Sequence, residues 1–410
     1  MKVERVGLGY RADIVEEGIA IGIDRLTEAR GEMTGEVTVQ RAPEGHIMRS
    51  RLNLTSSSAR KQAANFCRER SPGADWVELF ERFAVGVLDQ ERDGAPARLI
   101  GDLPLRPGID WLLEPILIRG TATMLYGEGG VGKSTMTAAI ALSVACGRSI
   151  MDGWSVKSQT PVLVIDWESD SDDWNDLFQL LRAGMGYEPP AVHYMEGKGS
   201  LPGMIHRVAR EIDRTGAGLV IIDSVGLATP ASREGSDAND SALRLFAALR
   251  TLGVTSLLID HVSKAQVASD SSAQGPYGSV YKTNSARSVY ELRAGPETED
   301  GARTIIMHHR KANRTRRQEP VAIRVTRDDR HIHLERTEMP ATTPAIGRET
   351  DRASDRVLAA FEAGRPMSRK ELAEASGVSP SQVGVYLSRE LSGKVVRVGG
   401  EGREALYERL

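Results

Sequence analysis

The stretch TATMLYGEGGVGKS at residues 121–134 decides the fold of this chain. Its first part is short and rich in apolar and β-branched residues, which is typical of a buried strand. Its second part, Gly127 to Ser134, fits the pattern GxxxxGK[ST], and a helix is predicted to follow over 133–146. A strand that turns through glycines into a helix is the context that this pattern needs. The stretch therefore predicts a phosphate-binding loop, or P-loop.

The residue types of this loop suit phosphate and a divalent cation. Glycines allow successive backbone N–H groups to point inward at phosphate oxygens, and the helix N-terminus adds its positive dipole end. Lys133 is long enough to reach the β- and γ-phosphates, and the Ser134 hydroxyl can ligate Mg²⁺. We therefore expect the phosphates to be bound by Gly127, Glu128, Gly129, Gly130, Val131, Gly132, Lys133 and Ser134.

The residues around the loop, 106–340, alternate β-branched runs with helical patterns, which predicts an α/β fold with a mostly parallel sheet and crossover helices. The predicted strands are 121–127, 161–168, 191–195, 218–225 and 255–262, and the predicted helices are 133–146, 172–185, 204–215 and 238–251. Beyond residue 287 the pattern changes to four short runs, which we expect to add antiparallel strands at the edge of the sheet.

Two carboxylates end strands of this predicted sheet, where ligands gather in open α/β folds. Asp223 follows the apolar run GLVII and is expected, together with Ser134, to hold Mg²⁺. Glu168 ends the strand after the P-loop helix, and we favour it as the group that orients and polarises the attacking water. Glu128, inside the loop, and Asp166, on the same strand face as Glu168, remain alternatives.

The chain on either side of this core is expected to form two further modules. Residues 1–105 predict a small α+β module with a three-stranded antiparallel sheet and helices over 57–70 and 75–90. Residues 341–352 lack apolar periodicity and are read as a linker. Residues 353–410 predict three helices and a β-hairpin.

The last of these modules, 353–410, resembles a winged helix-turn-helix domain. Ser368 and Glu371 form a capping box before its second helix, and Pro380 begins its third. The resemblance implies either duplex DNA binding through the third helix, with few charges on its exposed positions, or docking of a protein partner. The exposed positions are Ser381, Gln382, Ser388 and Arg389, and the hairpin adds Arg397 and Arg403.

The order of the core motifs resembles RecA-like ATPases, and among them the RepA-type hexameric helicases of plasmids and their phage relatives. The resemblance covers about residues 106–325. It rests on the P-loop, on VLVIDWES, on GLVIIDS and on the later run LLIDHVSK. It implies that the nucleotide is ATP, that Thr135 binds beside Lys133 and Ser134, that Glu168 and Asp223 are catalytic, and that His261 senses the γ-phosphate.

The same resemblance implies that basic residues act on the nucleotide of the neighbouring subunit in a hexameric ring. Lys311 is the best positional match, and Arg314 or Arg310 is a candidate for its partner. Family members often have Lys-x-Arg here, whereas this chain has two residues between Lys311 and Arg314, so the second basic residue stays open. Residues 303–336 hold ten Lys and Arg against four Asp and Glu, which suits this role, nucleic acid, or a solvated basic turn.

Two loops rich in Gly, Ser, Ala and Asp, 228–241 and 264–283, follow the strands that end in Asp223 and His261. The resemblance implies that they line a pore and grip single-stranded DNA, with Lys264, Lys282 and Tyr277 as contacts, although connective loops have the same composition. The predicted function is that of a replicative helicase, a ring ATPase that moves along single-stranded DNA. The alternatives are an ATP-switched DNA-binding regulator and a helicase loader or scaffold.

The composition of the chain argues against several classes of protein. The chain has 410 residues, 40% of them apolar, and a net charge of −3, so no overall charge excess indicates nucleic acid or membrane. It has two cysteines, Cys67 and Cys146, without metal-ligand spacing, which argues against a disulfide framework or a zinc site. Because no signal-peptide pattern and no apolar run of about 20 residues occurs, we expect a cytoplasmic protein.

Overall fold

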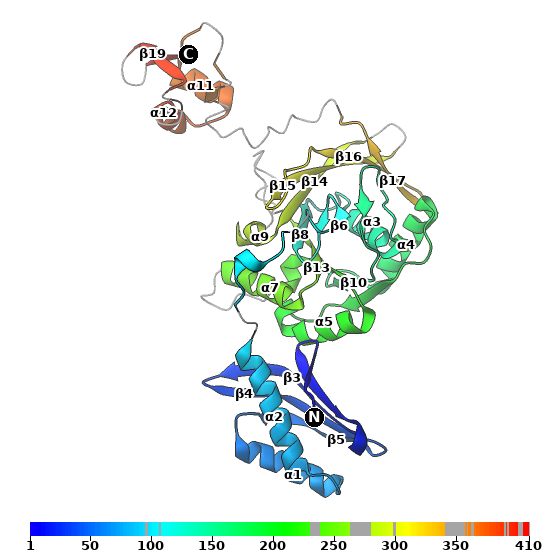
Figure 1. Ribbon diagram of the computed structural model, residues 1–410. Helices are drawn as coiled ribbons and strands as arrows, with labels where there is room; N and C mark the ends of the chain where they lie inside the picture. The colour runs from blue at the N-terminus through cyan, green and yellow to red at the C-terminus, as the bar shows by residue number, and fades with distance from the viewer. Residues whose placement is uncertain are drawn as a thin grey trace. The chain divides into compact units, whose positions relative to one another are not determined.

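The computed structural model describes all residues except 95–96, 106–107, 230–237, 263–279, 298–300, 341–356, 359, 362–364, 389–390, 392, 401–404 and 410 (Figure 1). The chain forms two compact units, of which one covers Met1–Pro340 and the other Ala341–Leu410, residues 271–273 excepted. Among the described helices, none is long and apolar enough to cross a membrane.

The larger unit is built on a nine-stranded sheet with the order β11-β10-β12-β13-β8-β14-β15-β16-β17. The six strands from β11 to β14 are parallel, and β15, β16 and β17 continue the sheet antiparallel. The bounds are β8 Ala122–Gly127, β10 Val162–Asp166, β11 Val192–Glu196, β12 Leu219–Asp223, β13 Thr255–His261, β14 Ser288–Glu297, β15 Arg303–Ala312, β16 Val321–Arg327 and β17 Ile332–Thr337. The predicted α/β class, with a mostly parallel sheet and antiparallel edge strands, is confirmed.

One strand differs from its prediction. We expected β14 to be antiparallel, but it pairs in parallel with β8, from Ser288 opposite Thr123 to Leu292 opposite Gly127. The reason is that a long connection, which includes α9 (Val280–Ser285), separates it from β13, and such a crossover returns the chain in the same direction.

Helices cover both faces of the sheet. Alternate residues of β8 divide between the faces, because Leu125 packs in one hydrophobic cluster and Met124 and Tyr126 pack in the other. The first cluster includes α3 (Lys133–Cys146) and α4 (Ser171–Met185). The second includes α5 (Leu201–Thr215), α6 (Val225–Ala228) and α7 (Ala238–Leu252).

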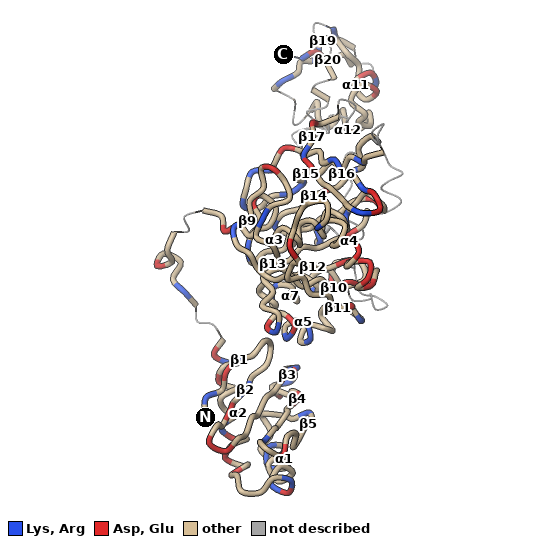
Figure 2. The backbone as a smooth tube through the Cα atoms, turned by 90° about the vertical axis from the view of Figure 1, so that its right-hand side faces the viewer, with Lys and Arg blue, Asp and Glu red and all other residues tan. Residues whose placement is uncertain are grey.

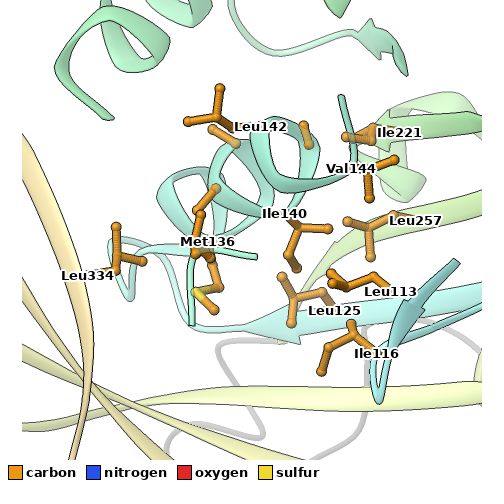
Figure 3. Packing of buried hydrophobic residues seen from close by; sticks show 14 of the residues in the cluster. Leu113, Ile116, Leu125, Met136, Ile140, Leu142, Val144, Ile221, Leu257 and Leu334 are labelled. Carbon is orange, nitrogen blue, oxygen red and sulfur yellow. The ribbon is translucent and has the colours of Figure 1, made fainter. Parts of the chain in front are cut away.

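The helix α3 lies in the middle of its cluster. Figure 3 shows Met136, Ile140 and Val144 among side chains from the nine-stranded sheet, which include Leu334 of β17. All three residues are fully buried. A helix buried on nearly all sides needs an apolar sequence around its whole circumference, which explains the run TMTAAIALSVAC. Its burial fixes the position of the N-terminal end of the helix, where the P-loop ends.

A small sheet was missed by the sequence. It consists of β6 (Trp111–Glu114), β7 (Leu117–Ile118) and β9 (Ser155–Val156). Strands of two to four residues are too short to show a period of two.

The residues before the ATPase-like core form their own sheet and their own hydrophobic cluster. The sheet has five antiparallel strands in chain order rather than the three we predicted, and α1 (Ser57–Arg70) and α2 (Trp76–Asp93) pack on it. The strand β1 was missed because it is short and exposed, whereas β2 was overlooked although Tyr10, Ala12 and Ile14 alternate with Arg11 and Asp13. The bounds are β1 Glu4–Val6, β2 Gly9–Ile14, β3 Ile19–Ala29, β4 Glu32–Arg41 and β5 Gly45–Asn53, with short 3-10 turns at Val15–Glu17 and Ile100–Asp102.

The smaller unit has a hydrophobic cluster of its own, from Val357 to Val395. A three-stranded sheet with the order β18-β20-β19 accompanies two helices. The predicted capping box of Ser368 and Glu371 is present at the start of the first helix. The bounds are β18 Met367–Ser368, α11 Arg369–Ser376, α12 Pro380–Ser388, β19 Val395–Gly399 and β20 Leu406–Arg409.

Candidate nucleotide site

The P-loop connects the end of β8 to the start of α3. Gly130 and Gly132 have φ angles of 75° and 97°, a region that residues with a side chain rarely adopt. A Cβ atom on Gly132 would also lie 2.6 Å from Cδ1 of Ile305, whereas one on Gly129 would meet nothing within 4 Å. The loop path therefore requires glycine at position 132 for two independent reasons.

Lys133 is the first residue of α3, and its side chain folds back over the loop. It is only 6% exposed, and its Nζ donates hydrogen bonds to the carbonyl oxygens of Gly127 and Glu128, at 3.1 and 2.8 Å. Burial lowers the pKa of Lys133, and the nearby carboxylates of Asp223, Glu168 and Asp260 oppose this shift. The ammonium group is thus held beside the loop where the phosphates of a bound nucleotide would lie.

Glu168, Ser224 and His261 are brought together at the ends of three strands, because the first two follow β10 and β12 and the third is the last residue of β13. One oxygen of Glu168, Oε1, accepts a hydrogen bond from the Ser224 hydroxyl and lies 3.2 Å from Nε2 of His261. The side chains of Glu168 and His261 are 39% and 42% exposed, so both can meet a ligand. Ser224 was missed by the sequence, although its place directly after Asp223 was a usable signal.

Glu168 does not end its strand, because β10 stops at Asp166. The fully buried Asp166 instead anchors the turn that carries Glu168. It accepts hydrogen bonds from the Glu168 backbone N–H at 2.7 Å, from Trp174 Nε1 at 2.5 Å, and from Ser169. These contacts give Asp166 a structural role, and Glu128, the other alternative, is exposed in the loop.

Asp223 lies at the end of β12, in register with Asp166 at the end of β10. Burial raises the pKa of Asp223 to about 7, the carboxylates of Asp166 and Glu168 add to the rise, and Lys133 opposes it. The oxygens of Asp223 and of the neighbouring carboxylates are of the type that Mg²⁺ prefers. A divalent cation beside Asp223 would offset this crowding of negative charge, and the role of Ser134, which is exposed at the start of α3, as a second ligand stays a prediction.

Lys311 and Arg314 lie away from the P-loop of their own chain. Lys311 is opposite Val289 on β14, which is opposite Met124 on β8, three residues before Gly127. This places Lys311 about 10 Å back along the strand direction. Its Nζ donates to the carbonyl oxygens at the end of α9, those of Thr283, Asn284 and Ala286, at 2.7 to 2.8 Å.

Arg314 lies still further toward the start of β8. It lines a hollow of about 820 Å³ together with Asp110, Arg119 and Thr121. The strand β15 runs antiparallel to β8, so the residues that follow it emerge at the sheet edge opposite the P-loop. Lys311 and Arg314 are therefore not part of the site formed by Lys133, Glu168, Asp223 and His261 of the same chain.

The predicted DNA contacts fall into two groups. Lys264 and Tyr277, and most of the loop 228–241, lie outside the described residues. Lys282 is described, and the prediction that it contacts nucleic acid is wrong. Its side chain is 7% exposed and forms an ion pair with Asp260 at 2.9 Å, because it lies on α9, which packs against the sheet. The local sequence around Lys282 does not predict that its side chain is buried.

A cleft of about 700 Å³ adjoins the P-loop and was not found from the sequence. On one side it is lined by Gly132 and Thr135, and on the other by Arg303, Val325 and Arg327 from the antiparallel strands. No ion pair joins Arg303 or Arg327 to another residue in the described part of the chain. The cleft thus combines apolar surface with two guanidinium groups.

Comparison with known proteins identifies a matching family model and a similar solved structure. A family model described as an AAA domain matches residues 96–267, a range that includes the P-loop, Glu168, Asp223 and His261. No curated protein sequence matches the chain. A solved structure of a KaiC-like protein from the hyperthermophilic archaeon Pyrococcus horikoshii OT3 is similar, with a TM-score of 0.40 and 19% identity over 56% of this chain and 99% of that chain.

The matched AAA domain and the P-loop site together define the class. The chain contains a P-loop ATPase domain built on a mostly parallel sheet.

Proposed function

We propose that this ATPase assembles into a ring and acts on DNA as a helicase of the plasmid or phage type. The observation that carries the proposal is that the residues predicted to act on the nucleotide lie toward two opposite edges of the sheet. Lys133, Glu168, Asp223 and His261 lie at the carboxyl edge of the parallel strands. Lys311 and Arg314 lie toward the opposite edge, where a head-to-tail neighbour would present its own nucleotide.

The residues at the carboxyl edge have distinct roles in the proposed hydrolysis. Lys133 and the loop N–H groups hold the β- and γ-phosphates, and Asp223 and Ser134 hold Mg²⁺, which neutralises phosphate charge when bound. Glu168 orients the water that attacks the γ-phosphorus and accepts its proton. His261 lies 3.2 Å from Glu168 and reports whether the γ-phosphate is present.

The cleft beside the P-loop is the proposed place of the nucleobase. Phosphates on the loop would leave the ribose and base beside Thr135, between α3 and the strand residues Arg303 and Arg327. A guanidinium plane stacks well on an aromatic base, which makes these two arginines suitable partners.

Lys311, with Arg314 as a candidate partner, is proposed to act on the nucleotide of the neighbouring subunit, where a cation stabilises charge on the transferring phosphoryl group. All three donors of Lys311 are satisfied within its own chain by carbonyl groups of α9. Acting in trans therefore requires Lys311 to exchange these hydrogen bonds for phosphate contacts.

One observation favours an alternative, an ATP-switched regulator that binds duplex DNA. The C-terminal unit has its own core, and α12 exposes Ser381, Gln382 and Ser388, which can read base edges. Because none of these three is charged, phosphate affinity would have to come from elsewhere. The winged-helix assignment of this unit is part of the proposal.

The deciding experiment is ATP turnover with and without single-stranded DNA, with Lys133→Ala as the inactive control. The proposal predicts turnover that rises with single strands, together with a ring mass in ATP. Turnover that ignores single strands, with tight binding of a duplex site, would favour the regulator instead. A monomer under all conditions would remove the trans role of Lys311.

A further inference from the structure

A buried ion pair lies directly beneath the site and has no part in the mechanism described so far. Asp260 Oδ2 accepts a hydrogen bond from Lys282 Nζ at 2.9 Å, and the two side chains are 2% and 7% exposed. Asp260 is the penultimate residue of β13, and Lys282 is on α9. The pair therefore joins the end of the strand to the helix that follows the next long connection.

The pair is linked to the reacting groups by a short chain of contacts. The second oxygen of Asp260, Oδ1, accepts a hydrogen bond from the backbone N–H of His261 at 3.0 Å. The ring of the same histidine lies 3.2 Å from Glu168. Lys282 thus holds Asp260, Asp260 holds the backbone of His261, and His261 contacts the group that orients water.

The helix that carries Lys282 is itself fixed at its other end. Lys311 on β15 donates to the last carbonyl groups of α9, as described above. Lys282 and Lys311 therefore attach this short helix to the sheet at two strands, β13 and β15, with β8 and β14 between them. When Lys311 exchanges these hydrogen bonds to act in trans, the ion pair with Asp260 still holds the helix to β13.

Stability alone gives a weak reason for this arrangement. Removing two charges from water costs free energy that a buried pair often only balances, and apolar residues of similar size frequently serve as well. Burial raises the pKa of Asp260, and the contact with Lys282 opposes that rise, so the lysine favours the ionised carboxylate in a place that disfavours charge. An ionised carboxylate is a strong acceptor for the His261 N–H.

We propose that Asp260 and Lys282 are positioning residues for ATP hydrolysis, which fix the His261 backbone so that its ring stays against Glu168. The inference rests on the proposed roles of Glu168 and His261. It concerns the hydrolytic step and not nucleotide binding, since neither residue lines the P-loop or the cleft beside it.

The test compares single-turnover hydrolysis and ATP affinity in the full chain for Lys282→Met and Lys282→Arg. Lys282→Met should slow hydrolysis by up to about 100-fold, because small misplacements of catalytic groups have effects of that size. ATP affinity should not change, and Lys282→Arg should recover much of the rate. Lys157→Met is the matched control, since it removes an exposed ion pair with Glu114 at 2.7 Å, and it should have wild-type activity.

A double-mutant cycle separates positioning from a general loss of structure. If Lys282 acts through His261, then Lys282→Met should have no further effect on the rate in a His261→Ala background. The variant Asp260→Asn/Lys282→Met removes both charges, so it should fold even if the single variant does not, and it should remain slow.

The outcomes are distinct. A folded Lys282→Met protein with a wild-type rate overturns the inference, as does a double variant that recovers both melting temperature and rate. Effects of Lys282→Met and His261→Ala that simply add would also overturn it. If the wild-type chain neither binds nor hydrolyses ATP, or if Glu168→Gln leaves hydrolysis unchanged, the proposed function fails instead.

Discussion

Gly132 shows how strictly a single residue determines the P-loop. Its φ of 97° disfavours a side chain and a Cβ atom would displace the terminal methyl group of Ile305, while Gly129 in the same loop is free of both constraints. We predict that Gly132→Ala lowers the free energy of unfolding by at least about 1–2 kcal/mol, the usual cost of a left-handed conformation for a residue with a side chain.

Gly129→Ala is the matched control for this prediction and should change stability little. Both variants are compared by chemical denaturation without nucleotide, so that contacts with a ligand play no part. Equal stability of the two variants would contradict the geometry of the loop.

Glu168 provides the second prediction at this scale. Glu168→Gln keeps the size and the hydrogen-bonding capacity of the side chain but removes its basicity. Hydrolysis should fall by about 10²–10⁴-fold, the usual contribution of a general base, while ATP binding is retained. Turnover and binding of a fluorescent ATP analogue measure the two effects separately, and unchanged turnover would exclude Glu168 as the base.

At the scale of single elements, β15 carries two buried histidines whose charge depends on pH. His308 and His309 are 4% and 6% exposed, and His309 stacks on Tyr290 at 4.2 Å between ring centroids. Burial lowers the pKa of each to about 4 from an ordinary value of 6.5, and neighbouring arginines add to the shift. Both rings are therefore neutral in the folded protein at neutral pH.

This burial predicts a loss of stability in mild acid. Below pH 6.5 the unfolded chain takes up protons that the folded chain excludes until about pH 4. The free energy of unfolding therefore falls as the pH drops through this window, by up to about 3 kcal/mol for each histidine. Melting curves from pH 7.5 to 5 test this, and His309→Leu should flatten the dependence. A wild-type melting temperature that stays constant down to pH 5 would contradict the prediction.

The elements differ in how well their sequence predicts them. The helix α3 begins and ends where its pattern indicated, because glycines precede and follow a continuous apolar run. By contrast, the direction of β14 depends on what its neighbour in the sheet is, and no property of SVYELR itself records that. The short strands β6, β7 and β9 were missed for lack of a periodic signal.

The residues of the candidate site also differ in how well the sequence predicts them. Lys133, Ser134 and Asp223 could be found because they stand at fixed places relative to a strand end. Arg303 and Arg327 could not, since they line the neighbouring cleft only through tertiary packing, whereas Ser224 was overlooked although it directly follows Asp223. Lys282 misled us because a lysine beside a polar loop is usually exposed, and only the position of α9 buries it.

At the scale of the whole molecule, basic and acidic residues are interspersed along the chain, as Figure 2 shows. The near-zero net charge thus reflects mixing rather than segregation into oppositely charged units. Binding of DNA would have to depend on local groups, of which the C-terminal unit is one proposed source.

Removing that unit gives a prediction at this scale. A chain ending at Pro340 keeps the complete nine-stranded sheet and its clusters, so it should fold and hydrolyse ATP. If the C-terminal unit is a DNA-binding winged helix, the shortened chain should lose duplex binding measured by fluorescence anisotropy. Full duplex affinity without the unit would assign that activity elsewhere.

The opposite placement of Lys133 and Lys311 has an arithmetical consequence for mixed assemblies. If each active site needs Lys133 from one copy and Lys311 from the next, subunits carrying Lys133→Ala and subunits carrying Lys311→Ala are both inactive alone. Mixed in equal amounts, about one junction in four would unite an intact P-loop with an intact Lys311 in a randomly assembled head-to-tail ring. Two inactive preparations should then regain up to about a quarter of wild-type turnover, whereas a site contained within one chain would regain none.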